Sequence, residues 1–143
     1  YFHGESMRPF LVEGDEVMVE PIVFGEIRIG DVITYRFADK FPTRRVVRKH
    51  EKGLDLWCEN WPTRRYICAP EEVLGVAVAR GRDGKWISSQ SQEWLAARRR
   101  AIRAWRRVSA GLRLWLGALT ITGLSVMFLV VRYLVGWSSA TWL

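Results

Sequence analysis

The sequence of 143 residues contains few cysteines, histidines and prolines. The two cysteines, Cys58 and Cys68, are too few for a disulfide framework, and their spacing matches no zinc-binding pattern. We expect two small buried side chains, or a single bridge across a hairpin if the domain lies in an oxidising compartment. No metal ion and no cofactor is expected. The first residues also lack the charged and then apolar pattern of a signal peptide.

Acidic residues are outnumbered, with 15 Asp and Glu against 22 Lys and Arg, a formal net charge of +7 and a sequence pI near 10.0. A basic balance favours an acidic partner, which is a nucleic acid, an anionic membrane surface or an acidic protein. No helix-turn-helix pattern is visible, which argues against DNA recognition. The position of the positive charge along the chain decides between these partners.

The first 87 residues carry short apolar runs separated by Gly, Pro, Asn and Asp. Strands are predicted over residues 16–21, 31–37, 44–49, 54–58, 66–69 and 73–79, where apolar side chains alternate or cluster. Many short strands with frequent turns predict a mainly β domain over residues 1–87, built as an antiparallel barrel or folded sheet.

Residues 88–113 have a different pattern, which predicts a basic amphipathic helix over 92–112. Its apolar residues recur at helical spacing, and arginines occupy most of the remaining positions. The apolar residues are Leu95, Ile102, Trp105, Val108 and Leu112, and the arginines are Arg98, Arg99, Arg100, Arg103, Arg106 and Arg107.

Residues 114–131 form the one long uncharged run, and its length predicts a transmembrane helix over 114–135 with a short tail at 136–143. The aromatic residues Trp115, Tyr133 and Trp137 lie where interfacial aromatics are expected. The alternative of a buried helix is disfavoured, because the rest of the chain is too small to enclose it.

The arginine cluster, together with Arg113, precedes this run, and a single arginine follows it. The positive-inside rule then places the N-terminal domain in the cytoplasm and the tail outside a membrane crossed once. The bilayer is the simplest partner for the arginines, and a membrane protein or complex is the second. Nucleic acid, bound by arginines interleaved with Trp94 and Trp105, is disfavoured because the span already accounts for the charge.

The segment GESMRPFLVEGDEVMVEP, residues 4–21, resembles the nucleophile box of type I signal peptidases and LexA-like serine peptidases. Further resembling segments follow in the family's order at 29–36, 44–48, 59–60 and 73–80, so the resemblance covers about residues 4–86. The residues that carry the first segment are Gly4, Ser6, Met7, Pro9, Gly14 and Asp15.

The resemblance implies that Ser6 occupies the nucleophile position and that its backbone amide is an oxyanion donor. Gly4 would let a substrate backbone approach, Met7 would anchor the segment by packing, and Gly14-Asp15 would be a structural turn. A serine hydroxyl is a weak nucleophile, so this chemistry also requires a neighbouring base.

Two departures remove the acid–base partners that the family uses. Arg44 stands where the family has its lysine or histidine base, and arginine cannot be deprotonated in a protein. Tyr66 stands where the histidine-type relatives have an aspartate. Lys49 and His50 lie about 16 to 20 Å further along an extended strand, at roughly 3.3 Å per residue, and are too distant to substitute.

The sequence therefore predicts a catalytically inactive, membrane-anchored, signal peptidase-like protein that acts as a structural or accessory subunit of a membrane complex. The family's groove binds extended peptide, which suits docking without cleavage. The alternative is an active membrane serine endopeptidase in which His3, Lys40 or a partner chain supplies the base for Ser6. A membrane-tethered, nucleic-acid-associated LexA-like regulator is a third hypothesis. A cytoplasmic domain that precedes its span also differs from the usual signal peptidase topology.

Overall fold

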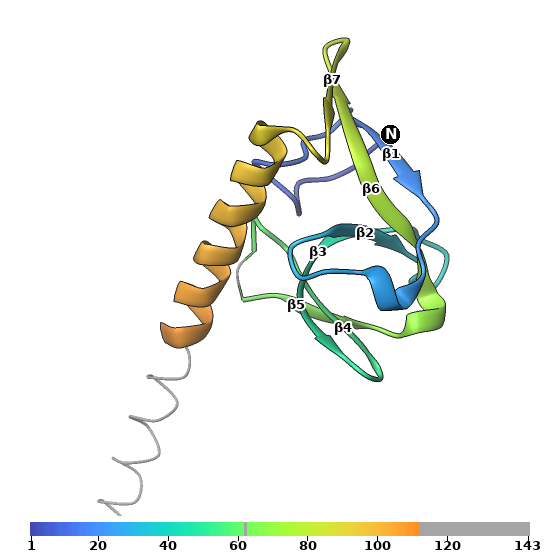
Figure 1. Cartoon of the computed structure of the whole chain (residues 1–143), viewed down its shortest axis with the longest axis vertical. Coiled ribbons are helices and arrows are strands. Elements are labelled where there is room, and N and C mark those ends of the chain that lie inside the picture. The colour runs from blue at the N-terminus through green and yellow to red at the C-terminus, as the bar shows by residue number, and fades with distance from the viewer. Residues whose placement is uncertain (62, 112–143) are drawn as a thin grey trace, which may run out of the picture. The chain divides into compact units, whose positions relative to one another are not determined.

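The described part of the chain contains seven antiparallel strands, two short 3-10 helices, η1 (Phe24–Glu26) and η2 (Pro70–Glu72), and one longer helix after the strands (Figure 1). The computed structural model describes residues 1–61 and 63–111. The predicted span and tail lie outside the described residues, together with Arg113, Trp115, Tyr133 and Trp137. Within the described residues, no helix is long and apolar enough to cross a membrane. The strands are β1 (Glu16–Glu20), β2 (Val32–Tyr35), β3 (Thr43–His50), β4 (Gly53–Trp57), β5 (Arg65–Cys68), β6 (Val73–Arg82) and β7 (Lys85–Ser88).

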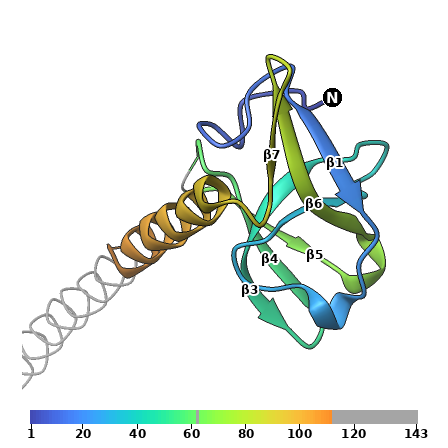
Figure 2. The ribbon, with the colours of Figure 1, turned by 45° about the horizontal axis from the view of Figure 1, so that its top comes forward.

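The strands form a single folded sheet in the order β1-β6-β2-β3-β4-β5, with β7 paired to β6. The ten-residue strand β6 pairs with β1, β2 and β7, so it joins the two halves of the sheet (Figure 2). The register shifts between Met18 and Val19, between Thr34 and Tyr35, and between Val46 and Arg48. Such bulges bend strands and increase their twist, which lets a short sheet fold over its own core.

All six strands predicted from the sequence are present, and the mainly β, antiparallel architecture is confirmed. The strand β7 was not predicted, because its side chains are mostly exposed and give no alternating apolar pattern. The strand β6 continues three residues beyond the predicted end. This extension contains Arg80 and Arg82, whose guanidinium groups donate hydrogen bonds to acceptors inside the domain.

The core consists of three buried clusters, and the first holds the N-terminal segment in place. Met7 and Leu11 are fully buried in that cluster beside Val32 of β2, and Phe10 packs edge-on against Trp94 with ring centroids 4.7 Å apart. Burying an apolar side chain of this size contributes about 1.5 to 3 kcal/mol. The segment before β1 is therefore fixed by packing, although it contains no strand of its own.

The arginine-rich helix, residues 92–111 of the described chain, begins after Ser91, whose hydroxyl accepts a hydrogen bond from the Trp94 amide at 3.2 Å. Trp94, Ala101 and Trp105 are buried at helical spacing, and Trp105 lies 5.9 Å from Trp57 between ring centroids. The first compact unit extends from Tyr1 to Arg106, so it includes the β-sheet and most of this helix.

Candidate functional site

Ser6 lies in the irregular segment before β1 and is 5% exposed. Its backbone oxygen accepts a hydrogen bond from the Asn60 amide at 3.2 Å, and the adjacent Met7 is completely buried. Gly4 has a φ of +99°, a left-handed conformation that favours glycine. These contacts hold the N-terminal segment that carries the serine against the turn that follows β4.

Arg44 lies directly against the serine. One of its terminal nitrogens, Nη1, donates to the Ser6 hydroxyl oxygen at 2.6 Å and to the Thr43 carbonyl at 2.7 Å. The strand pairing of Arg44 with Ile33 of β2 fixes the backbone from which this side chain extends. The residue in the predicted base position therefore contacts the residue in the predicted nucleophile position, although 38 positions separate them in the sequence.

Tyr66, in the predicted acid position, also lies close to Arg44. The guanidinium carbon is 5.4 Å from the centre of the Tyr66 ring, and Cys58 is buried beside both side chains. Burial raises the pKa of the Cys58 thiol, and the positive charge of Arg44 only partly opposes this increase. Burial likewise raises the pKa of Tyr35 to about 12. Cys58 and Tyr35 are therefore neutral neighbours of Arg44 at physiological pH.

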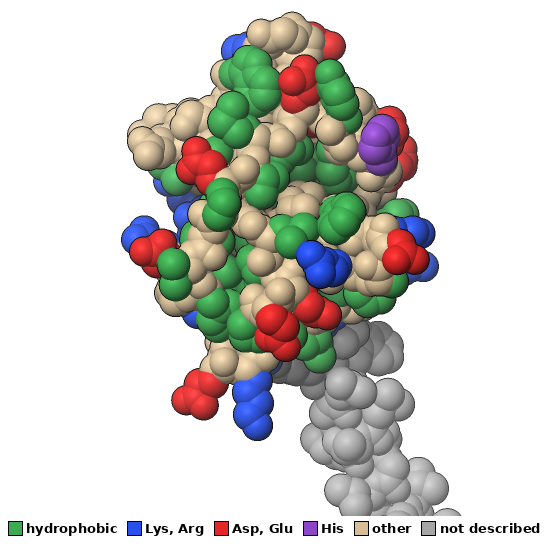
Figure 3. Space-filling model, turned by 90° about the vertical axis from the view of Figure 1, so that its right-hand side faces the viewer, with side chains coloured by type: hydrophobic (Ala, Val, Ile, Leu, Met, Phe, Trp, Pro, Cys, Tyr) green, Lys and Arg blue, Asp and Glu red, His purple; other side chains and the backbone are tan. Residues whose placement is uncertain are grey.

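A groove with a volume of about 640 Å³ opens beside Ser6 and Arg44. Figure 3 shows the side of the molecule that carries the N-terminus, where apolar side chains are interspersed with single acidic and basic ones. The walls of the groove are apolar and aromatic as well as charged. Its lining includes Gly4, Ser6, Lys40, Phe41, Arg44 and Trp61.

The two alternative bases considered for Ser6, His3 and Lys40, both line this groove. The His3 ring nitrogen Nδ1 lies 2.8 Å from a carboxylate oxygen of Glu13, and the Gly4 amide donates to the same carboxylate. Lys40 lies in a turn closed by two backbone hydrogen bonds with Phe37. Within the part of the chain that the structure describes, no hydrogen bond joins either side chain to Ser6.

Lys49 and His50 are occupied elsewhere, as their distance along β3 predicted. The Lys49 ammonium donates to three backbone carbonyls, of Phe24, Gly25 and Ile27. A ring nitrogen of His50 lies 3.2 Å from the Asp55 carboxylate. Neither side chain is available to take a proton from Ser6.

No protein-family model matches this chain. A comparison with curated proteins also finds no significant similarity.

Asp15, the acidic residue of the predicted structural turn, is buried and forms hydrogen bonds within the domain. Its carboxylate accepts the Val12 amide at 2.9 Å and two donors of Arg82, each at 2.7 Å. Burial acts to raise the pKa of Asp15, but the hydrogen bonds from Arg82 and Val12 hold it below the usual value. Asp15 therefore joins the start of β1 to the end of β6.

The cysteines are free, and both are buried. Cys68 pairs with Leu54 across β4 and β5, so it lies four residues along the sheet from Cys58 and no bridge across the hairpin joins them. Among the residues that the structure describes, no three His, Cys, Asp or Glu side chains are grouped to hold a metal ion.

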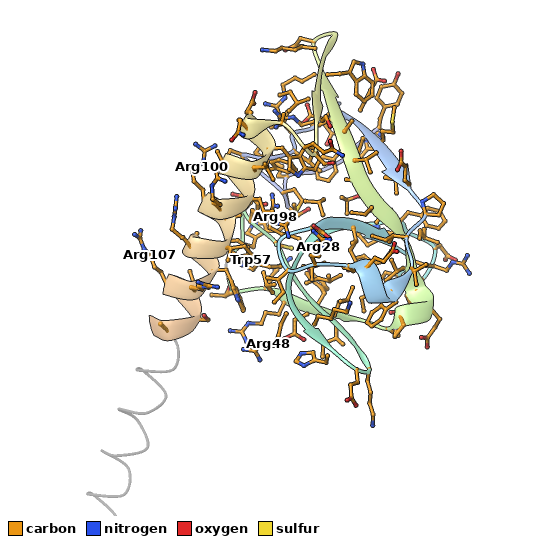
Figure 4. All side chains as sticks on the ribbon, in the orientation of Figure 1. Arg28, Arg48, Trp57, Arg98, Arg100 and Arg107 are labelled. Carbon is orange, nitrogen blue, oxygen red and sulfur yellow. The ribbon has the colours of Figure 1, made fainter. Side chains whose placement is uncertain are left out.

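The arginines of the arginine-rich helix divide into two kinds. Arg98 faces the sheet, where it pairs with Asp31 at 3.2 Å and donates to the Ile29 carbonyl at 2.6 Å (Figure 4). The exposed arginines are Arg99, Arg100, Arg103, Arg106 and Arg107. The predicted surface role therefore falls mainly on the exposed set.

Sequence reasoning missed two features of the site. It did not place Cys58 beside Arg44 and Tyr66, although the cysteine directly precedes the Glu59-Asn60 element that resembles a family motif. It also did not identify Phe41 and Trp61 as groove walls, because loop conformations bring them there.

Proposed function

We propose that this protein is a non-catalytic member of the signal peptidase/LexA-like superfamily. It acts as a membrane-anchored structural or accessory subunit of a membrane protein complex. The observation that carries the proposal is the 2.6 Å hydrogen bond from the Arg44 guanidinium to the Ser6 hydroxyl oxygen.

A working serine nucleophile needs a base that can accept its proton. The guanidinium has five donors and no acceptor, and it remains protonated at every physiological pH. Its hydrogen bond also occupies a lone pair of the hydroxyl oxygen, which lowers the electron density available for attack. An arginine in this position therefore preserves the packing of the site while it removes the catalytic step.

Support for the superfamily resemblance comes from the way in which separate segments meet. The 4–21 segment, the start of β3, the turn after β4 and strand β5 contribute Ser6, Arg44, Asn60 and Tyr66 to one small region. An antiparallel β domain in which these segments converge is what the order of the motifs implied.

The membrane attachment is proposed from the sequence. The uncharged run at 114–131 would span the bilayer, and the exposed arginines of the preceding helix would lie near anionic headgroups, at about 1 kcal/mol for each basic residue close to the surface. The groove would then present a binding surface to a neighbouring membrane protein. The predicted cytoplasmic placement follows from the arginines that precede the span.

An active membrane serine endopeptidase remains the second candidate. It is favoured by one observation, which is that His3 and Lys40 line the groove that also contains Ser6. A substrate or partner that moved either side chain toward the hydroxyl would supply a base.

The deciding experiment compares the native chain with Ser6→Ala, both in membranes, on a reporter that carries a signal-peptidase-type cleavage site. Mass spectrometry of the reporter should show no serine-dependent cleavage, because no group that can accept the proton contacts Ser6 in the described residues. Cleavage by the native chain that disappears in Ser6→Ala would refute the proposal. In that event, His3→Ala and Lys40→Ala would identify the base.

A further inference from the structure

Among the residues that the structure describes, Arg44 has no acidic partner, whereas three other arginines that reach into the domain each have one. Arg45 pairs with Glu59 at 2.5 Å, Arg80 with Glu93 at 3.2 Å and Arg82 with Asp15 at 2.7 Å. Within the described residues, Arg44 forms no ion pair. Its enclosed Nε also has no hydrogen-bond partner there.

A positive charge without an acidic partner is costly in a partly buried position, even where hydrogen bonds to neutral groups offset part of the cost. Arg44 is partly shielded from water, and burial raises the pKa of its neighbours Cys58 and Tyr35, so neither offers it a negative charge at physiological pH. Burying a charge away from water is unfavourable unless a counter-charge or a full set of hydrogen bonds offsets it. The position is therefore prepared for an anion that enters from the groove.

Two further donors accompany the guanidinium. The Ser6 hydroxyl accepts from Arg44 through its oxygen, so its own hydrogen can be donated toward the groove. The Ser6 backbone amide makes no hydrogen bond within the described part of the chain. A planar group with two acceptor oxygens, which is what arginine recognises best, fits this set of donors.

The remaining groove lining favours a singly charged group on a peptide. Phe41, Pro42 and Trp61 offer apolar and aromatic surface of the kind that side chains of an extended segment contact. Glu5, Asp39 and Lys40 also line the groove and are exposed; together with Arg44 they make two acidic and two basic side chains, so the lining has no excess of positive charge for a doubly charged anion.

We infer that the groove binds the C-terminal segment of a partner polypeptide, with the free α-carboxylate held by Arg44 and Ser6. This inference rests on the proposed non-catalytic function, since an active site would have to release a carboxylate rather than retain it. The substitution that removes the base thus converts a cleavage site into a carboxylate receptor.

The test uses a degenerate library of N-acetylated hexapeptides prepared in two halves. One half ends in a free carboxylate and the other in a carboxamide of distinguishable mass. The full chain, held in nanodiscs of neutral phosphatidylcholine, is equilibrated with both halves, and mass spectrometry measures the bound fraction of each. The native chain should enrich the carboxylate half by about tenfold or more, since charge-assisted hydrogen bonds are roughly twice as strong as neutral ones.

Arg44→Gln should reduce the enrichment to about onefold while the carboxamide half still binds, because only the charged contact is removed. The retained carboxamide binding shows that the groove is still folded. Arg48→Gln is the matched control, since Arg48 lies on the same strand with a weak 3.9 Å pairing to Asp55, and it should keep the native ratio. Equal binding of both halves by the native chain, or binding of neither, overturns the inference.

Inorganic phosphate added at the peptide concentration should leave the enrichment unchanged. Displacement by phosphate would overturn the assignment to a peptide carboxylate. The same mass spectra report whether any peptide is cut. Serine-dependent cutting would refute the proposed function, whereas an enrichment of about onefold without cutting would refute only the carboxylate inference.

Discussion

At the scale of single residues, the difference between lysine and arginine decides what Ser6 can do. Both side chains reach a neighbouring hydroxyl and both carry a positive charge in water. Lysine loses its proton readily when it is desolvated, whereas arginine does not. The partly buried surroundings of Arg44, with Cys58 and Tyr66 against it, are of the kind that lowers the pKa of an amine.

Arg44→Lys should therefore give the site a base. We expect Ser6 to react with a serine-directed covalent probe at least about tenfold faster than in the native chain, since a positioned general base contributes about 10² to 10⁴ in rate. The reaction should accelerate as pH rises, because the neutral amine is the active form. Intact-mass measurement of the adduct over a pH series checks this.

The double variant Ser6→Ala with Arg44→Lys is the control and should remain unlabelled. A lysine variant as unreactive as the native chain would show that the site lacks more than the base. In that case, the substitution at Tyr66 would be the next position to test.

The proximity of Ser6, Arg44 and Tyr66 could be expected from the sequence, because the resemblance assigns all three to one site, whereas their roles there stay a prediction. Strand pairing fixes the register of each strand, so the residues of a motif on β3 or β5 have defined positions in the sheet. The contact of Glu13 with His3 could not be predicted in this way. It depends on how an irregular segment folds back on itself, for which spacing gives no rule.

At the scale of elements, the arginine-rich helix shows what an amphipathic pattern leaves undetermined. The pattern predicted the helix and its start, since Ser91 caps it directly before the predicted first residue. It did not predict the surface that the apolar stripe contacts, because a membrane and a protein core favour the same side chains. Trp105 belongs to that stripe, and its packing against Trp57, with ring centroids 5.9 Å apart, assigns this part of the stripe to the β domain.

Trp94→Ala should therefore lower the free energy of unfolding by about 3 to 5 kcal/mol, the usual cost of truncating a buried tryptophan. Trp94 is 4% exposed, and its loss leaves a cavity between the helix and the N-terminal segment that carries Ser6. Urea unfolding of the full chain in detergent, followed by circular dichroism, measures the change.

Arg99→Ala, an exposed position of the same helix, should stay within about 0.5 kcal/mol of the native chain. Similar losses in both variants would mean that the helix stabilises the domain by its own propensity. A large loss in Trp94→Ala alone would establish the contact with the sheet as its main contribution.

At the scale of the whole molecule, the exposed arginines of the arginine-rich helix and the groove beside Ser6 belong to different elements. The groove is lined by the N-terminal segment and by the loop before β3, whereas the exposed arginines lie on the helix that follows the sheet. A protein arranged in this way can attach to a membrane through one surface while the other binds a partner. The two functions should therefore be separable by mutation.

Cysteine labelling tests the proposed orientation of the chain in the membrane. Asp83→Cys introduces a reactive site in the exposed turn between β6 and β7, and Thr141→Cys introduces one in the predicted outer tail. The native Cys58 and Cys68 are buried and should react little. If the arginines hold the domain on the cytoplasmic side, as proposed, a membrane-impermeant maleimide applied to intact cells should label the tail variant and not the turn variant.

Neutralising the arginine cluster should then weaken the preference for the orientation in which the domain is cytoplasmic. Changing the exposed arginines and Arg113 to Gln, with Arg98 kept for its contact with Asp31, should make the Asp83→Cys turn accessible in part of the molecules. The same positions changed to Lys should keep the native labelling, since the rule depends on positive charge rather than on the guanidinium. Labelling of the turn in the native background would contradict the cytoplasmic placement. An unchanged pattern in the Gln variant would mean that another feature of the chain sets its orientation.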